Sequence, residues 1–558
     1  MTPAYQGFYV NIILCVGLTL LLSSLSNRDN RVRFFLCTLA LFFNFRYLAW
    51  RVEATLPPFH PDLATLWQYH FFLVEFAAVG LLSWHLVLLT VRPRNAMARD
   101  VADLPGPPPA VDVLIPTFNE PRKMLRATIR AAKRIQHEPL TVWILDDGAR
   151  DWLKELCAKE EINYVRREDR KGYKAGNLNH ALALCKGDYL LCLDADFVVH
   201  PNILKKTLGY FRDQKIGIVQ TPQHFENPDA IQYNLGGAHA WPEDQCVFTD
   251  MIQPCRDTWD NAFCYGTNFV VRRHCLDAVG GFPENTICED IFLTYLLKQH
   301  GWITRYHNER LAIGQAAMTL NEFIKQRMRW CCGTIQCLFL KGGPIFSRKL
   351  SLRDRIFYLD PAIFYFISMW PLLLTLSPAI YWWTGTPPFY SSQGHLMMMF
   401  FPRMWISVLS LYWLTDRKVV PVVSEIGRHL SMYYMVGTIL RTVGSPFSKV
   451  FRVTLKNVSR KATTINWTVL GPHLALALVT VAGIVYAFWS GDHSRILWDE
   501  NLGLVLALTV YMFWMSYFVV LACVEPALEK ERAHPRADLV RQGSISGSLL
   551  ALSRKVMQ

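Results

Sequence analysis

The stretch YLLCLDAD at residues 189–196 is a short apolar run that ends in two aspartates one residue apart. Similar runs precede and follow it: VDVLIP at 111–116, LTVWILDD at 140–147, NYVRR at 163–167 and GIVQTP at 217–222. Segments with the apolar spacing of helices, such as 121–135 and 201–211, lie between them. This alternation predicts an α/β domain with a largely parallel sheet, whose ligands sit at the carboxyl ends of the strands.

Long apolar stretches flank this domain on both sides. Each is about long enough to cross ~30 Å of hydrocarbon, and hydrophobic residues make up 51% of the chain. We therefore expect about seven membrane-spanning helices. Their expected bounds are 7–24, 33–50, 69–91, 357–383, 397–415, 466–489 and 502–523.

Basic residues collect beside these stretches and account for the formal net charge of +13. The loop 27–33 holds three arginines, and the segment 417–461 is also basic. Membrane topology explains this distribution better than nucleic-acid binding, because basic loops stay in the cytosol. We expect the N-terminus outside, and the α/β domain and the C-terminus in the cytosol.

The expected division of the chain follows from these spans. It is 1–92 for N-terminal spans, 93–345 for a cytosolic domain, 346–525 for C-terminal spans and 526–558 for a short basic tail. The 14 cysteines form no CxxC pairs, so we expect free or buried thiols rather than a zinc site or a disulfide scaffold.

Acidic residues end two of the predicted strands. Asp146 and Asp147 close one run, and Asp194 and Asp196 close another, so all four are expected at one crevice. An Asp-x-Asp pair offers the hard oxygen ligands that hold Mg²⁺ or Mn²⁺ beside a diphosphate. Acidic turns of this spacing are common, so the pair alone does not establish a metal site.

Two further segments carry polar residues of interest. Glu289 and Asp290 begin an amphipathic helix, where acidic residues are also favoured by the helix dipole. In QRMRW, Arg329 can pair with phosphate and Trp330 can stack on a sugar ring. On a helix lying at a membrane surface, the same two residues would be interfacial anchors.

The order of these pieces resembles one family. PTFNEP, LDDG, KAGN, DAD, the Glu-Asp pair and QRMRW follow each other between about 116 and 330, and VQTPQHFENPD and FRVTLK extend the likeness. The chain resembles the processive family 2 glycosyltransferases, most closely bacterial cellulose synthase catalytic subunits and curdlan-type β-glucan synthases, from about 40 to 536. The resemblance implies a GT-A type nucleotide-sugar transferase domain inserted in a polytopic domain of the bacterial inner (plasma) membrane.

The resemblance also implies an activity. The chain would be a processive, inverting β-glucan synthase that transfers glucose from UDP-glucose to the non-reducing end of a polymer and moves it across the membrane. The implied partners are the UDP-sugar, the growing β-glucan, the bilayer and periplasmic or membrane subunits. Two alternatives stay open: a hyaluronan- or chitin-type synthase that uses UDP-N-acetylglucosamine, and a non-processive transferase that acts on a lipid carrier.

Residue roles follow from the matching motifs. Asp290 would be the general base, with Glu289 beside it, and Arg329 would stabilise the departing diphosphate. Asp196 and Asp194 would hold Mg²⁺ or Mn²⁺, and Trp330 would stack on the acceptor. The implied donor-binding residues are Thr117, Glu120, Asp146, Asp147, Lys174, Asp194, Gln326 and Arg329. The implied gating loop, near 445–462, contains Phe451, Val453, Thr454 and Lys456.

The sequence departs from the family pattern at the acceptor side. Tyr265 stands in FCYGT where FFCGS is common, and Cys288 replaces the threonine of TED. We therefore leave 1,4-, 1,3- and mixed linkages open. Arg532 and Arg536 have an RxxxR spacing, but basic residues after a last span usually signal topology, so cyclic di-GMP binding is not expected. Asp360, near the end of a span, is expected to need a partner or water.

Overall fold

A seven-stranded mixed sheet forms the centre of the catalytic domain in the computed structural model of the chain. The structure describes residues 3–93, 104–237, 240–447, 460–490 and 500–528. The strand order is β3(Asn163–Val165), β2(Leu140–Asp146), β1(Val111–Thr117), β4(Tyr189–Cys192), β7(Phe269–Arg272), β6(Ile216–Gln220) and β8(Ile303–Tyr306). Neighbouring strands are parallel except where β7 runs against β4 and β6. The prediction of a largely parallel sheet is confirmed.

Helices cover both faces of the sheet, which explains why its strands are apolar runs rather than alternating ones. On one face, Val113 and Ile115 of β1 pack with α4(Arg122–Ala132) and α5(Asp151–Lys159). On the other, Leu114 packs with α6(Tyr173–Leu182) and α11(Glu289–Gln299). In the register of β1 and β2, Thr117 lies opposite Asp146. The polar residues at these strand ends therefore meet at one edge.

Six helices are long and apolar enough to cross a membrane in the part of the chain that the structure describes. They are Asn30–Thr55, Leu63–Leu89, Leu352–Thr384, Gln393–Leu414, Trp467–Trp489 and Leu502–Cys523. The helix α1(Pro3–Ser24) supplies a shorter apolar segment at Tyr9–Ser24. The expected count of about seven spans agrees with these helices.

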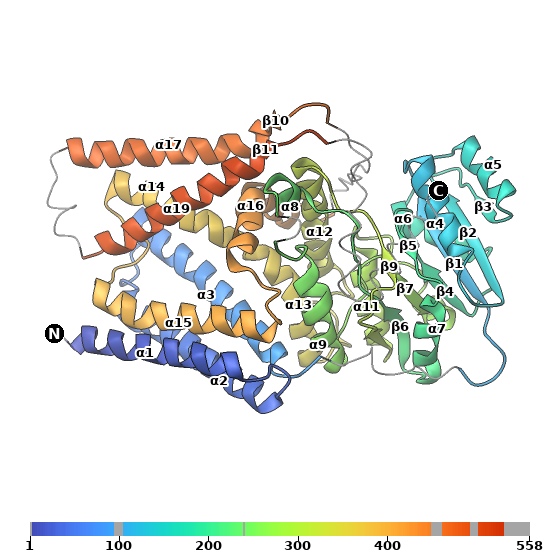
Figure 1. Cartoon of the computed structure of the whole chain (residues 1–558), viewed down its shortest axis with the longest axis horizontal. Coiled ribbons are helices and arrows are strands. Elements are labelled where there is room, and N and C mark those ends of the chain that lie inside the picture. The colour runs from blue at the N-terminus through green and yellow to red at the C-terminus, as the bar shows by residue number, and fades with distance from the viewer. Residues whose placement is uncertain (1–2, 94–103, 238–239, 448–459, 491–499, 529–558) are drawn as a thin grey trace.

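The basic segment 417–461 contains a helix that the sequence did not predict, α16(Pro421–Gly444). It packs against α12(Leu320–Phe339), the helix that contains QRMRW. In Figure 1, α12 and α11 lie between the membrane helices and the sheet, and the N-terminus lies at the end of the bundle remote from the sheet. The gating-loop residues 451–456 and the tail 529–558, with Arg532 and Arg536, lie outside the described residues.

All 14 cysteines are free thiols, and 13 of them are buried. This agrees with the prediction from the missing CxxC pairs. Asp360, on α13(Leu352–Phe366), also has the partners that its position in a span requires. Its carboxylate contacts Arg256 and His85.

A buried ion pair joins two of the spans. Arg51 Nε lies 2.8 Å from Glu75 Oε2, on the long helix α3(Leu63–Leu89), and both side chains are almost completely buried. The Tyr47 hydroxyl donates to the other Glu75 oxygen at 2.5 Å, and the Arg51 guanidinium lies over the Phe389 ring. Because a charge at this depth is stable only when paired, the pair specifies how the spans pack.

We expect Glu75→Gln to leave the Arg51 charge buried without its counterion and to lower the free energy of unfolding by about 3–5 kcal/mol. Thermal unfolding in detergent measures this loss. Glu53→Gln, at an exposed position on the same segment, is the matched control and should unfold with the wild type. Equal melting temperatures for both variants would contradict the assigned role of the pair.

Candidate active site

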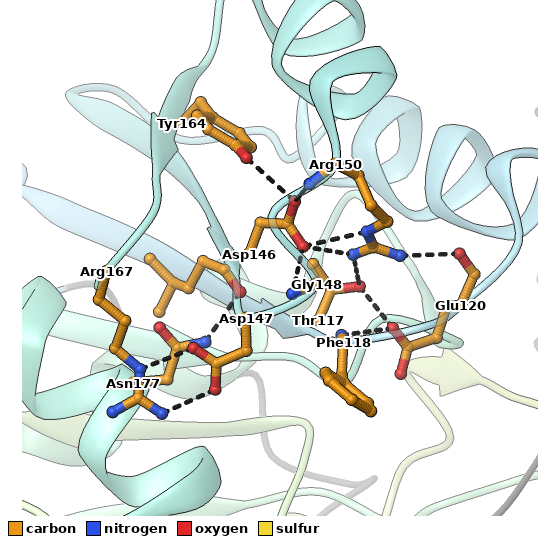
Figure 2. Close-up of polar contacts among 11 residues, drawn as sticks. Thr117, Phe118, Glu120, Asp146, Asp147, Gly148, Arg150, Tyr164, Arg167 and Asn177 are labelled. Carbon is orange, nitrogen blue, oxygen red and sulfur yellow. Dashed lines mark hydrogen bonds and ion pairs between the residues drawn. The ribbon is translucent and has the colours of Figure 1, made fainter. Parts of the chain in front are cut away.

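The loop after β1 is held by a polar network that reaches the end of β2 (Figure 2). Glu120 accepts hydrogen bonds from the Thr117 hydroxyl at 2.5 Å and from the Phe118 backbone at 2.8 Å. Arg150 donates to Thr117 Oγ1 at 2.8 Å and to the Glu120 carbonyl at 3.0 Å. The two predicted donor-binding residues Thr117 and Glu120 therefore form one rigid unit with Arg150, a residue that the sequence analysis missed.

Asp146 holds this loop in place through its hydrogen bonds with Arg150. Its side chain is buried and accepts five hydrogen bonds: three from Arg150, one from the Gly148 backbone and one from the Tyr164 hydroxyl. Both oxygens of this buried carboxylate therefore have hydrogen-bond partners. Asp146 thus fixes the turn in which Asp147 is presented.

Asp147 is paired with Arg167, which the sequence analysis also missed. Arg167 donates through Nε and Nη2 to the two Asp147 oxygens, at 2.6 and 2.7 Å (Figure 2). The same guanidinium donates to the carbonyls of Lys171 and Tyr173 at the start of α6. Each Asp147 oxygen keeps a second acceptor position. The pair therefore links the end of β2 to the helix that carries Lys174 and leaves the carboxylate able to accept further hydrogen bonds.

Lys174 contacts three segments that are far apart in the sequence. Its ammonium donates to Asp194 at 2.5 Å and to the Gly266 carbonyl at 2.6 Å, and lies 3.9 Å from Glu289 Oε1. Burial disfavours the charged lysine, but Asp194 and Glu289 outweigh it, so the pKa of Lys174 is raised. The ammonium therefore stays charged and holds the end of β4 next to the start of α11.

Asp290 lies at the centre of this cluster. Desolvation and the neighbouring Glu289 raise the pKa of Asp290 to about 7. Desolvation also raises the pKa of Glu289, against the nearby Lys174. A carboxyl group with a pKa near neutrality can take up and release a proton under ordinary conditions, which is the property of a general base.

Gly266 forms the wall beside Asp290. Its φ is +106°, and an added Cβ would lie 2.8 Å from Asp290 Oδ2. Only glycine combines this backbone conformation with such a close approach. The FCYGT segment thus lies against the Asp290 carboxylate, a contact that its position in the sequence did not reveal.

The pair Asp194 and Asp196 follows β4 at the same edge of the sheet. Asp194 is engaged by Lys174, and the choice of Asp196 as the stronger metal ligand stays a prediction. Among the described residues, no group of three or more His, Cys, Asp or Glu side chains could by itself hold a metal ion. Two carboxylates fit a divalent cation only if a ligand such as a diphosphate completes its coordination.

The helix α12 lies directly against the start of α11. An added Cβ at Gly333 would lie 2.4 Å from Cys288 Sγ, and the Cys288 thiol lies 3.9 Å from the Trp330 carbonyl. Arg329 is near enough to lower the pKa of Glu289, opposing its desolvation. QRMRW and the Glu-Asp pair, about 40 residues apart in sequence, thus belong to one site.

The remaining predicted residues lie around this contact. Trp330 is half-buried, with the Arg327 guanidinium 4.7 Å from its ring centre. Gln326 lines a small pocket with Asp229, Glu243 and other residues of the segment before β7. The Tyr265 hydroxyl points toward the sheet, where it donates to the Thr221 carbonyl at 3.2 Å and contacts the Tyr306 hydroxyl at 2.9 Å.

Comparison with known proteins identifies related sequences. Residues 107–333 match the sequence model described as glycosyltransferase like family 2, and residues 277–515 match the one described as cellulose synthase. A UDP-forming cellulose synthase catalytic subunit of Pseudomonas fluorescens is 29% identical across 94% of this chain and 70% of its own. Cellulose synthase 2 of Novacetimonas hansenii is 29% identical across 91% of this chain.

The relatives differ in length. This chain spans only 32% of the Novacetimonas hansenii protein and 35% of cellulose synthase 1 of Komagataeibacter xylinus, which is 28% identical. Among solved structures, the mannosyltransferase PcManGT from Pyrobaculum calidifontis, in complex with GDP-Man and Mn²⁺, covers 75% of this chain and all of its own at 15% identity and a TM-score of 0.40.

We expect Gly266→Ala to disturb Asp290 as well as the backbone. The positive φ alone should cost about 1–3 kcal/mol of stability, and the added methyl group must displace the Asp290 carboxylate. Gly301→Ala is the matched control, because Gly301 has a φ of +88° and open space around its Cβ position. Both variants should melt at similarly lowered temperatures, whereas only Gly266→Ala should lose turnover of a UDP-sugar. Equal turnover in the two would contradict the contact with Asp290.

Proposed function

Because the chain carries a family 2 glycosyltransferase domain, we propose that it is a processive, inverting β-glucan synthase. It transfers glucose from UDP-glucose to the non-reducing end of a growing polymer and passes the product across the membrane in which it lies. The observation that carries this proposal is the position of Asp290, which lies between the Lys174 cluster and the helix α12 that joins the membrane spans.

The donor nucleotide would bind at the ends of β1 and β2. The free acceptor positions of Asp147 suit the N–H group of a uracil ring, while the unit of Thr117, Glu120 and Arg150 forms the adjoining wall. Asp146 acts through this loop and does not need to touch the nucleotide. Lys174 and Arg329 are the cations available to the diphosphate from the protein.

A divalent cation, Mg²⁺ or Mn²⁺, would be held by Asp196 and Asp194, and when bound it would neutralise charge on the diphosphate. Asp290 would accept the proton of the acceptor hydroxyl as that oxygen attacks the anomeric carbon from the face opposite the diphosphate. One displacement of this kind inverts the centre and gives a β-linkage from an α-linked donor. Trp330 would stack on the acceptor sugar and orient the hydroxyl.

The membrane topology belongs to the same proposal. Arg33, at the start of the second span, donates to the Leu89 carbonyl, at the end of the third span, at 2.6 Å. The Cys255 thiol, from the segment between β6 and β7, donates to the Val91 carbonyl at 3.6 Å, so this end of the bundle lies next to the α/β domain. By the positive-inside rule this end faces the cytosol, and the N-terminus faces the opposite side. The residues 451–456 would close over bound nucleotide.

Product analysis tests the function. Purified protein in lipid nanodiscs would be incubated with UDP-glucose and Mg²⁺ or Mn²⁺, and we expect UDP release together with a polymer that a β-1,4-glucanase digests. Digestion by a β-1,3-glucanase would indicate a curdlan-type product. Incorporation of N-acetylglucosamine from UDP-N-acetylglucosamine would place the enzyme in the chitin and hyaluronan synthase group. A single sugar transfer to a lipid would exclude processivity. No UDP release from any donor would overturn the proposal.

The pH dependence of UDP release should follow Asp290. A base must be deprotonated to act, so the rate should rise with pH and level off above about 7, the pKa of Asp290. The folded protein also binds the extra proton between the unfolded pKa of about 4 and this value, so its stability should fall as pH rises across that window. Asp290→Asn should remove the slope and lower turnover by about 10²–10⁴-fold. Asp277→Asn, on an exposed helix, serves as the control. A rate that levels off near pH 4 would argue against Asp290 as the base.

A further inference from the structure

A buried arginine joins the catalytic domain to the membrane helices at a point that the proposed reaction does not use. Arg256, on α9(Gln253–Thr258), is completely buried. Its Nη1 donates to Asp360 Oδ2 at 2.7 Å, and its Nη2 donates to the Phe357 carbonyl at 2.7 Å, both on α13. The other Asp360 oxygen lies 3.2 Å from His85 Nε2 on α3. Two spans therefore meet at the Asp360 carboxylate, which the guanidinium contacts.

The same side chain contacts the loop 261–266, which leads to Gly266. Arg256 Nε donates to the Asn261 carbonyl at 3.2 Å, and the guanidinium lies 4.8 Å from the centre of the Phe263 ring. Gln253, on the same short helix, exchanges hydrogen bonds with the backbone of Phe263 in both directions. The position of the loop is thus set by α9, and α9 is held by α13.

The end of this loop controls the surroundings of Asp290. The Cys264 backbone N–H donates to Thr294 on α11 at 2.9 Å, and Gly266 lies against the Asp290 carboxylate. The helix α11 is itself tied to α13, because the Tyr295 hydroxyl donates to the Tyr358 carbonyl at 3.1 Å. The loop 261–266 and the helix α11, which lie on either side of Asp290, are therefore both held in place by α13.

We propose that Asp360, Arg256 and His85 are positioning residues: through loop 261–266 they hold Gly266 and Asp290 in register with the membrane helices. The inference rests on the proposed function, because it concerns the geometry of its base. If the Arg256–Asp360 pair only stabilised the junction between the α/β domain and the spans, the contacts of Arg256 with α13 would be sufficient. The additional contacts to Asn261 and Phe263 use the Nε donor and the face of the guanidinium to fix the loop.

The first test measures the loop without any turnover. Cys264 and Cys157 are both buried, the former in the loop and the latter in the core between α5 and the sheet. In Asp360→Asn we expect alkylation of Cys264 by iodoacetamide, resolved by mass spectrometry, to become about tenfold faster while that of Cys157 stays unchanged. Faster labelling of both thiols would mean general loosening and would overturn the proposal, as would no change in either.

The second test separates binding from chemistry. In Asp360→Asn, kcat for UDP release should fall about tenfold or more while KM for UDP-glucose stays at the wild-type value, and Asp360→Glu should recover part of kcat because it keeps the charge. Glu75→Gln, which breaks a buried ion pair far from the loop, should melt earlier but keep kcat. Equal kcat for Asp360→Asn and wild type, or an equal loss in Glu75→Gln, would contradict the proposal.

A second variant and the labelling readout cover the cases in which Asp360→Asn does not accumulate or the wild type is inactive. If Asp360→Asn does not accumulate, Arg256→Lys tests the same link, since an ammonium cannot contact Asp360, Phe357 and Asn261 together; it should show the same selective labelling of Cys264, and wild-type labelling would overturn the proposal. A wild-type protein that releases no UDP would refute the proposed function, whereas the labelling of Cys264 would still report whether the loop depends on Asp360.

Discussion

One ammonium group among several carboxylates is the interaction on which the site depends. Carboxylates within a few ångströms of each other cannot all remain charged unless a cation or a proton compensates them. Lys174 compensates Asp194 and part of the charge of Glu289. What remains is relieved by the proton that Asp290 holds below neutral pH. The edge of the sheet is therefore electrostatically prepared for a proton acceptor, and it has room for additional positive charge.

The folding of each segment serves this cluster. The parallel register of β1, β2 and β4 brings their ends to one edge, and the turn after β3 supplies Arg167, which orients both Asp147 and the start of α6. The antiparallel strand β7 then brings the FCYGT segment back across that edge. Because Gly266 has no side chain, the backbone of this segment can lie directly against the Asp290 carboxylate.

The membrane spans are continuous with this arrangement. The helix α12 contacts the start of α11 through Gly333 and Cys288, and on its other side packs against α16. Two buried ion pairs hold the helices in place: Arg256 with Asp360 at the junction with the α/β domain, and Arg51 with Glu75 between two spans. Charges in such surroundings have few alternative partners, so each pair specifies one packing. Residues of the site thus come both from the strand ends of the sheet and from α12, beside the membrane helices.

The sequence by itself determined the class of fold, the spans and most of the polar residues of the site. Apolar runs, two of them ending in aspartates, predicted β1 to β4 and β6, and the order of motifs predicted a family 2 glycosyltransferase. It did not separate Asp146 from Asp147, or reveal Arg150, Arg167 and Arg256, or predict β7, β8 and α16. The reason is physical: local pattern decides whether a segment becomes a strand or a helix, but the partner of a buried charge comes from a distant segment. Only close packing in the folded chain decides that partner, and with it the protonation of Asp290.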